Sequence, residues 1–513
     1  MKIKKIILGI LVLMGVSILW ADSSCATTWY VRDGGGNATQ CTGTTNAIYP
    51  GSGTNQPCAF NHPRYVLGWG CGNNGSNNPC TGKNPVMGQG DALYISGDSD
   101  INPGTQAQYE IGYDDTGKNL TPGCSSAYPY DCTLGNIPAG ISPTQLTIVK
   151  GTGAHQPQLW GTQRVWSVLS ADSGNLDLEN VEITQHSACV EQGGDPNGTV
   201  DGFPAVCVQS TYPYGPWAPN GIYLQGTNIT TANLYIHGMA HTSIYFPGNV
   251  ANWNSTNDRF IAAGWFHTDG PNMTFSGNNT QTNDVWAFGG CGEHYPMPDP
   301  GNIKNVANYH HCCDQNCGAL GGGFMMQNNG NASCGNWTIT NSQFLYNLKT
   351  NIDFLHCNGT GTFNIYKSRS EGSNGEALKL NVASANIENS QMIGNAAVWT
   401  TAPFKAILSP YSISGTAYSP LLCRGNNGTV FASTNGAVVN FLNSDISGNC
   451  TDLIGLSGSN SCSTNPQFNI YNSKLVAGYA LDLVNSSPGF VNLFFNSSSC
   501  AATVNEDYNS MSN

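Results

Sequence analysis

The stretch FNIYNSKLVAG, residues 468–478, alternates apolar and polar residues and then turns at Asn-Ser. The same pattern, with Asn or Lys before the Ser, occurs in WTITNSQFLYN from 337, FNIYKSRSEGS from 363, ANIENSQMIGN from 385 and VNFLNSDISGN from 439. Weaker copies are LDLENVEITQH from 176 and ANLYIHGMAHT from 232. Period-2 alternation is typical of a strand with one buried face, so each copy predicts a strand that ends in a turn.

The spacing of the copies indicates a solenoid. The intervals between the serines of the five strong copies are 26, 22, 54 and 29 residues, and we interpret 54 as two units of 27. A unit this short, built from strands and turns, cannot bury its own apolar face, so neighbouring units must stack. Stacked coils of this length predict a parallel β-helix with equivalent residues about 4.8 Å apart.

A second short strand follows most copies. Such strands are GIYLQG from 221, TSIYFPG from 242, NIDFLH from 351, GEALKL from 375 and YALDLV from 479. Each unit is therefore predicted to have two strands, separated by an Asn/Ser/Gly turn. Asn tolerates the left-handed backbone conformation, and its amide can bond its counterpart on the next coil, so we expect an asparagine ladder.

Four N-terminal stretches add to the repeats. TTWYVRDGGG from 27 and QPCAFNHPRYVL from 56 look like an opening strand and an amphipathic cap, and GDALYISGD at 90–98 and LTIVKGTGAHQPQLWG at 146–161 look like strands of the first and second coils. With the repeats, they resemble exported β-helix proteins of the pectate-lyase-like superfamily. The resemblance implies an all-β, right-handed, single-stranded parallel β-helix with a short N-terminal cap. It divides the chain into a cap region at 27–89, the β-helix at 90–490 and a tail at 491–513.

The first 26 residues have the layout of a secretory signal peptide. A lysine-rich start leads through an apolar run to small residues, and we expect cleavage after Ala26. This predicts bacterial-type export to a secreted or cell-surface location. No later stretch reaches the roughly 18 apolar residues that a membrane helix requires.

The cysteines favour disulfides. The chain has 19, and loss of Cys25 with the leader leaves an even number in an oxidising compartment. The stretch HHCCDQNC at 310–317 lacks the usual spacing of a zinc site. We therefore expect its cysteines to pair with each other and with Cys291, Cys334 or Cys357, although the sequence does not give the connectivity.

The composition limits the partners. Only 10% of the residues are charged, the net charge is −13, and 18 residues are Lys or Arg. Nucleic-acid binding is disfavoured, because phosphate contacts need clustered cations. An acidic polysaccharide would also be repelled unless a cation or a local basic patch intervened.

The charged residues gather between 267 and 380. In NIDFLH and GEALKL, the alternation predicts Asp353 and Lys379 facing solvent side by side, with Glu376 and His356 at the ends of the same strands. An acid, a base and a cation on one surface suit hydrolysis or β-elimination from a uronic acid. With Arg369, these are the catalytic candidates, and Lys379 or Arg369 could be the base.

Further candidates lie in the same span. The expected substrate-binding residues are His294, His310, His311, Trp286 and Tyr295. No cofactor is required by the sequence, but Asp314, Asp353 and Glu371 could bind calcium, as carboxylates do in calcium-dependent pectate lyases. By contrast, HGMAH at 237–241 and WFHTDG at 265–270 are typical of structural segments.

The sequence thus predicts an exported, monomeric protein that binds an extracellular polysaccharide along the 267–380 face and could cleave it by β-elimination. A lyase is favoured over a glycoside hydrolase. The alternative is a non-catalytic surface or matrix protein that uses the β-helix as a rigid scaffold. A metal-dependent hydrolase using His310 and His311 is a third hypothesis. The sequence leaves the substrate open.

Overall fold

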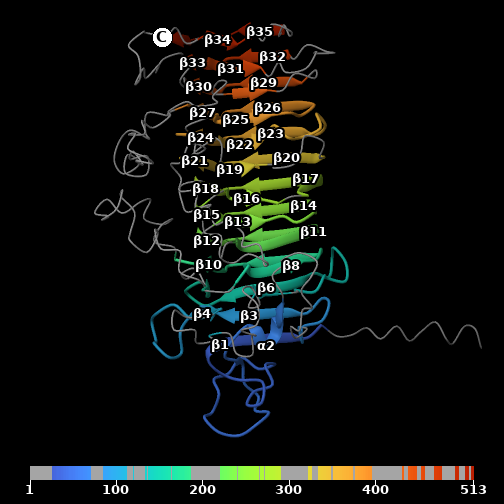
Figure 1. Ribbon diagram of the computed structural model, residues 1–513, viewed down its shortest axis with the longest axis vertical. Coiled ribbons are helices and arrows are strands. Elements are labelled where there is room, and N and C mark those ends of the chain that lie inside the picture. Colours follow the sequence, from blue (N-terminus) through green and yellow to red (C-terminus); the bar gives the residue numbers. More distant parts are fainter. Residues whose placement is uncertain are drawn as a thin grey trace, which may run out of the picture.

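The chain winds into a stack of coils along one axis, with β1 at one end and β34 and β35 at the other (Figure 1). In this computed structural model the described residues are 26–70, 85–112, 120, 133–135, 137–162, 165–186, 220–239, 241–264, 266–270, 272–289, 322–325, 333–347, 350–373, 376–394, 430–432, 437–447, 452–456, 467–476, 492–495, 503–507 and 510–512. The right-handed parallel β-helix expected from the pectate-lyase-like resemblance is confirmed.

Three sheets form the walls of the coil. The first contains β1 (Thr28–Gly36), β3 (Ala92–Ser96), β6 (Thr147–Thr152), β9 (Leu176–Glu179), the second half of β11 (Asn220–Ala232), β14 (Asn249–Thr256), β17 (Thr274–Thr282), β20 (Cys334–Thr340), β23 (Thr362–Tyr366), β26 (Ser384–Glu388), β29 (Val438–Leu442), β32 (Gln467–Tyr471) and β35 (Thr503–Asp507).

The second sheet contains β4 (Gln108–Ile111), β7 (Gln158–Gly161), β10 (Glu182–Thr184), β12 (Tyr235–Met239), β15 (Arg259–Ala263), β18 (Val285–Gly289), β21 (Gln343–Leu345), β24 (Arg369–Glu371), β27 (Gln391–Ile393), β30 (Asp445–Ser447), β33 (Lys474–Val476) and β36 (Ser510–Ser512).

The third sheet has two parts. The first part, continuous with the first sheet through β11, contains β2 (Trp69–Gly70), β5 (Thr133–Leu134), β8 (Ser167–Asp172), β13 (Thr242–Tyr245) and β16 (Thr268–Asp269). The second part contains β19 (Gly322–Met325), β22 (Thr350–Phe354), β25 (Leu378–Leu380), β28 (Val430–Ala432), β31 (Asp452–Leu456) and β34 (Asn492–Phe495). In the described part of the chain, these strands pair in parallel except β2 with β5.

Each complete coil therefore has three strands rather than the two that the sequence predicted. The copy WTITNSQFLYN forms two of them, β20 and β21, because the chain bends at Asn341, where φ is +52°. The predicted asparagine ladder is confirmed at this bend. The amide of Asn341 donates to Asn283 at 2.7 Å, and that of Asn283 donates to Asn257 at 2.9 Å.

In the coils from Ser342 to Ser473, the serine after the bend forms a second, buried ladder. The amide nitrogen of Ser342 donates to the hydroxyl of Ser368 at 3.1 Å, and Ser368 donates in the same way to Ser390. Ser390 bonds Ser444 directly at 3.2 Å, and β26 pairs with β29. The interpretation of the 54-residue interval as two units is therefore wrong, because the two serines lie on adjacent coils.

The two ends of the helix also differ in part from expectation. At the N-terminus, β1 pairs with β3 and β3 with β6, and α2 (Arg64–Leu67) is a single helical turn that places Val66 and Leu67 in the core. At the C-terminus, β34, β35 and β36 pair with β31, β32 and β33. The segment predicted as a tail from 491 thus adds another coil.

Apolar side chains fill the interior, and two disulfides are described. Cys41 bonds Cys58, and Cys334 bonds Cys357. Because Cys334 and Cys357 hold each other, neither is a partner for HHCCDQNC, as the sequence had suggested; that stretch lies outside the described residues. No helix in the described ranges is long and apolar enough to cross a membrane.

Candidate functional site

On the third sheet, one line of side chains points away from the apolar core. Tyr223 pairs with Tyr245, Tyr245 with Asp269, and Asp353 with Lys379 on adjacent strands. Their neighbours along the strands, such as Ile244 and Ile352, point into the core. We call this set the outer column: Tyr223, Tyr245, Asp269, Asp353 and Lys379.

The two parts of the third sheet are in register. A bridge joins Phe266 to Gly322, and Met325, three residues further on, pairs with Asp353. Asp269, three residues after Phe266, therefore lies two coils from Asp353. At a strand spacing of roughly 4.8 Å, their Cα atoms are about 9.6 Å apart.

Asp353 and Lys379 are neighbours, as the sequence predicted, but they do not face solvent. They are only 2% and 6% exposed, and Glu376 is 0% exposed. Glu376 Oε2 lies 2.9 Å from Lys379 Nζ and accepts the hydroxyl of Thr350 at 3.0 Å. The predicted surface pair is thus a buried charge cluster that contains two carboxylates and one ammonium.

The charges in this cluster determine what Lys379 can do. Burial alone would lower the pKa of Lys379, but the negative charges of Asp353 and Glu376 outweigh it, so the pKa is raised above its ordinary value. An amine that holds its proton this firmly cannot act as a general base near neutral pH. Lys379 is better suited to orienting its two carboxylates.

Aromatic rings form the adjoining part of the outer column. Tyr223 and Tyr245 stack with their ring centroids 5.7 Å apart and an interplanar angle of 24°. Trp166 meets Tyr245 edge-on at 5.9 Å. Such rings present flat apolar faces with a polar hydroxyl at one end, which is the chemistry that sugar rings pack against.

Asp269 ends this aromatic part. Burial raises its pKa to about 6, and a hydrogen bond from the Gly270 amide, at 2.7 Å, opposes the shift only in part. Burial and the nearby Asp269 charge raise the pKa of Tyr245 to about 12. Asp269 can therefore carry a proton close to neutral pH, as a general acid requires.

His241 lies beside Asp269. Its Nδ1 is 3.1 Å from Asn220 Oδ1, and the Asn220 amide nitrogen donates to the Trp166 carbonyl at 2.9 Å, which identifies Oδ1 as an acceptor. His241 Nδ1 must then carry the hydrogen, and Nε2 faces Asp269 Oδ2 at 3.8 Å. Burial lowers the pKa of His241 to about 4, so its ring is neutral.

The remaining described candidates lie elsewhere. Arg369 and Glu371 are on β24 of the second sheet, where Arg369 Nε donates to Glu371 Oε2 at 2.7 Å. His356 lies in the turn after β22, half-buried. Of the expected calcium ligands, Asp353 and Glu371 are on different sheets, and Asp314 lies outside the described residues. The described residues contain no group of three or more His, Cys, Asp or Glu that could hold a metal.

One substrate-binding prediction is wrong. Trp286 is fully buried in the core, where it stacks on Phe260 with ring centroids 3.8 Å apart, so it cannot stack on a bound sugar. Five other predicted site residues lie outside the described residues: His294, Tyr295, His310, His311 and Asp314.

Sequence reasoning missed Tyr223, Tyr245, Asp269 and His241. A signal was available, because GIYLQG and TSIYFPG place Tyr223 and Tyr245 at the same position, just as NIDFLH and GEALKL place Asp353 and Lys379. The strand at Asp269 has only two residues, too short for its alternation to be recognised. His241 immediately precedes β13 and reaches the site through side-chain contacts, which leave no pattern in the sequence.

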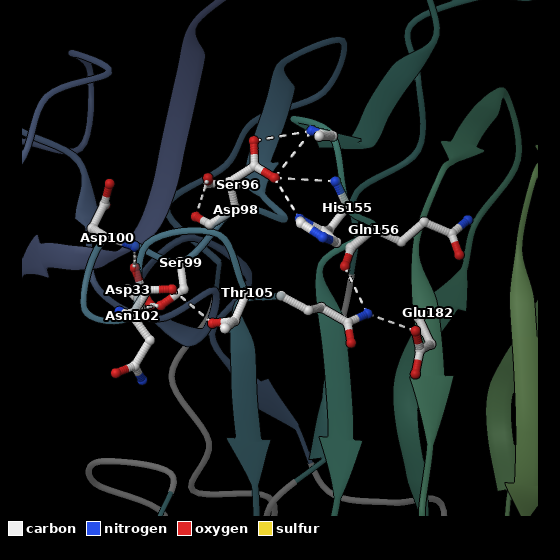
Figure 2. Close-up of polar contacts among 12 residues, drawn as sticks. Asp33, Ser96, Asp98, Ser99, Asp100, Asn102, Thr105, His155, Gln156 and Glu182 are labelled. Carbon is white, nitrogen blue, oxygen red and sulfur yellow. Dashed lines mark hydrogen bonds and ion pairs between the residues drawn. The ribbon is translucent and has the colours of Figure 1, made fainter.

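A second polar cluster lies near the N-terminal end of the coil (Figure 2). Asp98 accepts hydrogen bonds from the backbone amides of Ala154 and His155 and from the His155 ring at 2.8 Å. Gln106 joins the carbonyl of Gln156, at 2.9 Å, to the carboxylate of Glu182. These contacts link residues on successive coils, which is a structural role.

Comparison with known proteins adds to this picture. No family model and no curated protein matches the chain. Among solved structures, it is similar to pectate lyase Pel9A, with a TM-score of 0.34 and 11% identity over 95% of this chain and 79% of that chain. It is also similar to a rhamnogalacturonan lyase, with a TM-score of 0.32 and 10% identity over 93% and 87%.

A third similar structure is the GH136 lacto-N-biosidase from Eubacterium ramulus, with a TM-score of 0.38 and 10% identity over 93% of this chain and 68% of that chain. Similarity at this level does not extend to activity. The chemistry of the present chain has to follow from its own side chains.

Proposed function

We propose that the protein binds an extracellular polysaccharide along the outer column and hydrolyses a glycosidic bond there. The observation that carries the proposal is the pairing of two carboxyl groups in different surroundings on one sheet. Asp269 can hold a proton to about pH 6. Asp353 lies two coils away, next to the Lys379 ammonium. The negative charge of Asp353 helps Lys379 to keep its proton.

Hydrolysis assigns one role to each carboxyl group. Asp269 would donate its proton to the leaving glycosidic oxygen, and Asp353 would accept a proton from the attacking water on the opposite face of the sugar. A separation of roughly 6.5–9.5 Å between the two carboxyl groups leaves room for that water and gives inversion at the anomeric carbon. The two Cα atoms lie about 9.6 Å apart across two coils, a spacing nearer to that of an inverting pair than to the roughly 5–5.5 Å of a retaining pair.

The neighbouring side chains would orient the substrate and the acid. Tyr245 is half-buried and would offer an aromatic face to a sugar ring next to the acid, with the buried Tyr223 stacked behind it as support. The neutral His241, with Nε2 toward Asp269 and Nδ1 tied to Asn220, would position the carboxyl group.

The β-elimination expected from the sequence has less support than hydrolysis. Elimination requires an unprotonated base and a positive charge that neutralises the uronate carboxylate. Lys379 meets neither need, because it keeps its proton and two protein carboxylates already surround its charge. The chain's net charge of −13 also disfavours an acidic polymer at this place.

We also infer that the protein is exported. The predicted leader at 1–26 supports this inference, and so do the disulfides Cys41–Cys58 and Cys334–Cys357, because disulfides persist in oxidising compartments. N-terminal sequencing of the protein recovered from a secreting host tests it. A chain that begins at Thr27 is the expected result, and an intact leader on recovered protein would contradict export by this route.

The activity can be tested on a panel of neutral and acidic polysaccharides. New reducing ends without a rise in absorbance near 235 nm indicate hydrolysis, whereas reducing ends with that rise indicate elimination. We expect hydrolysis, with loss of at least about a hundredfold in rate for Asp269→Asn and for Asp353→Asn. Glu388→Gln, a carboxylate change on the first sheet, is the matched control.

Three results would overturn the proposal. Cleavage accompanied by the 235 nm signal would replace hydrolysis with elimination. Cleavage unaffected by either variant would move the site away from the outer column. Neither cleavage nor binding of any polymer in the panel would favour the non-catalytic scaffold.

A further inference from the structure

A pocket opens at the bend between the first and second sheets, away from the outer column. Its volume is ≈ 350 Å³. It lies where β20 turns into β21 and β23 turns into β24; in Figure 1, β21 and β24 are at the left edge of the stack. The side chains that give it its chemistry are Asn341, Gln343, Tyr346, Lys367, Arg369 and Glu371.

The asparagine ladder is interrupted at this pocket. Lys367 stands between Asn341 and Asn389, with the same left-handed backbone, at φ +50° compared with +52° and +51°. Lysine tolerates this conformation less well than asparagine, and it has no amide to continue the ladder. Lys367 therefore lacks the stabilising ladder contact and has an exposed ammonium instead. At the same position, six other coils have Asn with positive φ: Asn180, Asn233, Asn257, Asn283, Asn443 and Asn472.

A second cation lies close to the first. Arg369 is exposed, with 47% of its side chain accessible, and Glu371 orients its guanidinium from one side. The pocket thus has two positive charges and one negative charge. In a chain of net charge −13, this is a local surplus of positive charge, which attracts an anion.

An aromatic ring forms another part of the wall. Tyr346, at φ +54°, is half-buried, and its ring lies against the backbone of Gly372. A Cβ at Gly372 would come within 2.3 Å of Tyr346 Cδ1, so the absence of a side chain there permits this position of the ring. An aromatic face beside two cations suits a sugar ring that bears a carboxylate or sulfate.

We propose that this pocket is a second carbohydrate site, which binds an anionic sugar unit through Lys367 and Arg369 beside Tyr346. This inference goes beyond the proposed hydrolysis, because the pocket and the outer column are on different sheets. The site provides the local basic patch without which the acidic chain would repel an anionic polymer. It also assigns a binding role to Arg369, which the sequence placed among the catalytic candidates.

The test is a calorimetric titration of the full mature chain with three probes of equal length: a galacturonate hexamer, a sulfated galactan hexamer and a neutral galactan hexamer. We expect binding of one or both anionic probes, and weaker binding when salt is raised from 20 to 200 mM, as the Debye length shrinks. The two anionic probes distinguish a preference for carboxylate from one for sulfate. Lys367→Asn and Arg369→Gln should each weaken binding about tenfold.

The controls separate binding from folding and from the outer column. Lys367→Asn gives this bend the asparagine that the other coils of the ladder have. Its thermal unfolding temperature should therefore be no lower than that of the wild type. Lys474→Gln removes an exposed cation elsewhere on the second sheet and should leave binding unchanged. Asp353→Asn should keep anion binding while losing hydrolysis, so the two proposals can fail separately.

Two outcomes would overturn the second site. One is that neither anionic hexamer binds, at either salt concentration, to folded protein. The other is that an anionic hexamer binds but Lys367→Asn and Arg369→Gln leave its affinity unchanged.

Discussion

The backbone amide of Asp258 donates to a carboxyl oxygen of Asp284 at 2.9 Å, and both side chains are buried within the coil. The hydroxyl of Ser255 lies 2.8 Å from Asp258 Oδ2 and 2.6 Å from Asp284 Oδ2. One hydroxyl can donate to only one of them, so the other carboxyl must carry a proton to complete the contact. Burial raises the pKa of Asp258 to about 6 and, with the Asp258 charge, that of Asp284 to about 8.

This pair predicts a loss of stability as the pH rises. The folded carboxyls hold protons that the unfolded chain releases near pH 4, so the folded state binds more protons between about pH 4 and 8. The free energy of unfolding should fall across that window, by at most about 1.4 kcal/mol per pH unit for each proton. The variant Asp284→Ser gives this position the serine that the next coil has. It should make the free energy of unfolding depend less on pH.

Urea unfolding at pH 4.5, 6 and 8 would measure the slope, with Glu388→Gln as a surface control. Equal slopes for the wild type and Asp284→Ser would show that the pair does not hold the proton.

The pH dependence of hydrolysis should follow Asp269. The reaction needs this carboxyl in its protonated form, and its pKa is raised to about 6. The value of kcat/KM should therefore fall as the pH rises above about 6, approaching a tenfold loss per pH unit. A pH profile on a cleaved polysaccharide checks this, and a rate that continues to rise from pH 6 to 8 would exclude Asp269 as the acid.

Removing the buried ammonium should destabilise the third sheet. Lys379→Met leaves Asp353 and Glu376 close together without their cation, and we expect a loss of about 3–5 kcal/mol in the free energy of unfolding. The double variant with Glu376→Gln removes one of the unpaired charges and should recover part of that loss. Denaturant titrations of both variants measure the free energy of unfolding. A Lys379→Met variant as stable as the wild type would contradict the buried charge cluster.

Lys367→Asn should stabilise the fold. An asparagine there tolerates the left-handed backbone, and its amide can bond Asn341, for a gain of about 0.5–1.5 kcal/mol. Lys367→Ala provides the contrast, because alanine neither favours this conformation nor bonds the neighbouring coil. Thermal unfolding compares the two variants, and equal stability would show that the ladder bond does not form.

Much of the fold could be predicted from local pattern. Alternating apolar residues before Asn-Ser identify the strands, and the ladders at Asn341 and Ser342 follow from the backbone preference and hydrogen-bonding groups of those residue types. The length of the coils was harder to predict. Ser390 and Ser444 are direct neighbours although 54 residues separate them, so an interval in the sequence does not give the number of coils.

The candidate site could be predicted only in part. The alternation of NIDFLH and GEALKL placed Asp353 beside Lys379 correctly, but their burial does not follow from that pattern. Trp286 belongs to the core, because it is in register with the buried Phe260 and Phe344 of the two adjacent strands.

The sequence by itself determined the parallel β-helix and the pairing of Asp353 with Lys379, because strand alternation and the preferences of turn residues act over a few neighbouring positions. Only the tertiary structure decided that Tyr245, Asp269 and Asp353 share a column, and that Lys367 and Arg369 share a pocket on another sheet. Stacking brings together residues that are far apart in the chain. The burial that raises the pKa of Asp269 arises only from that stacking.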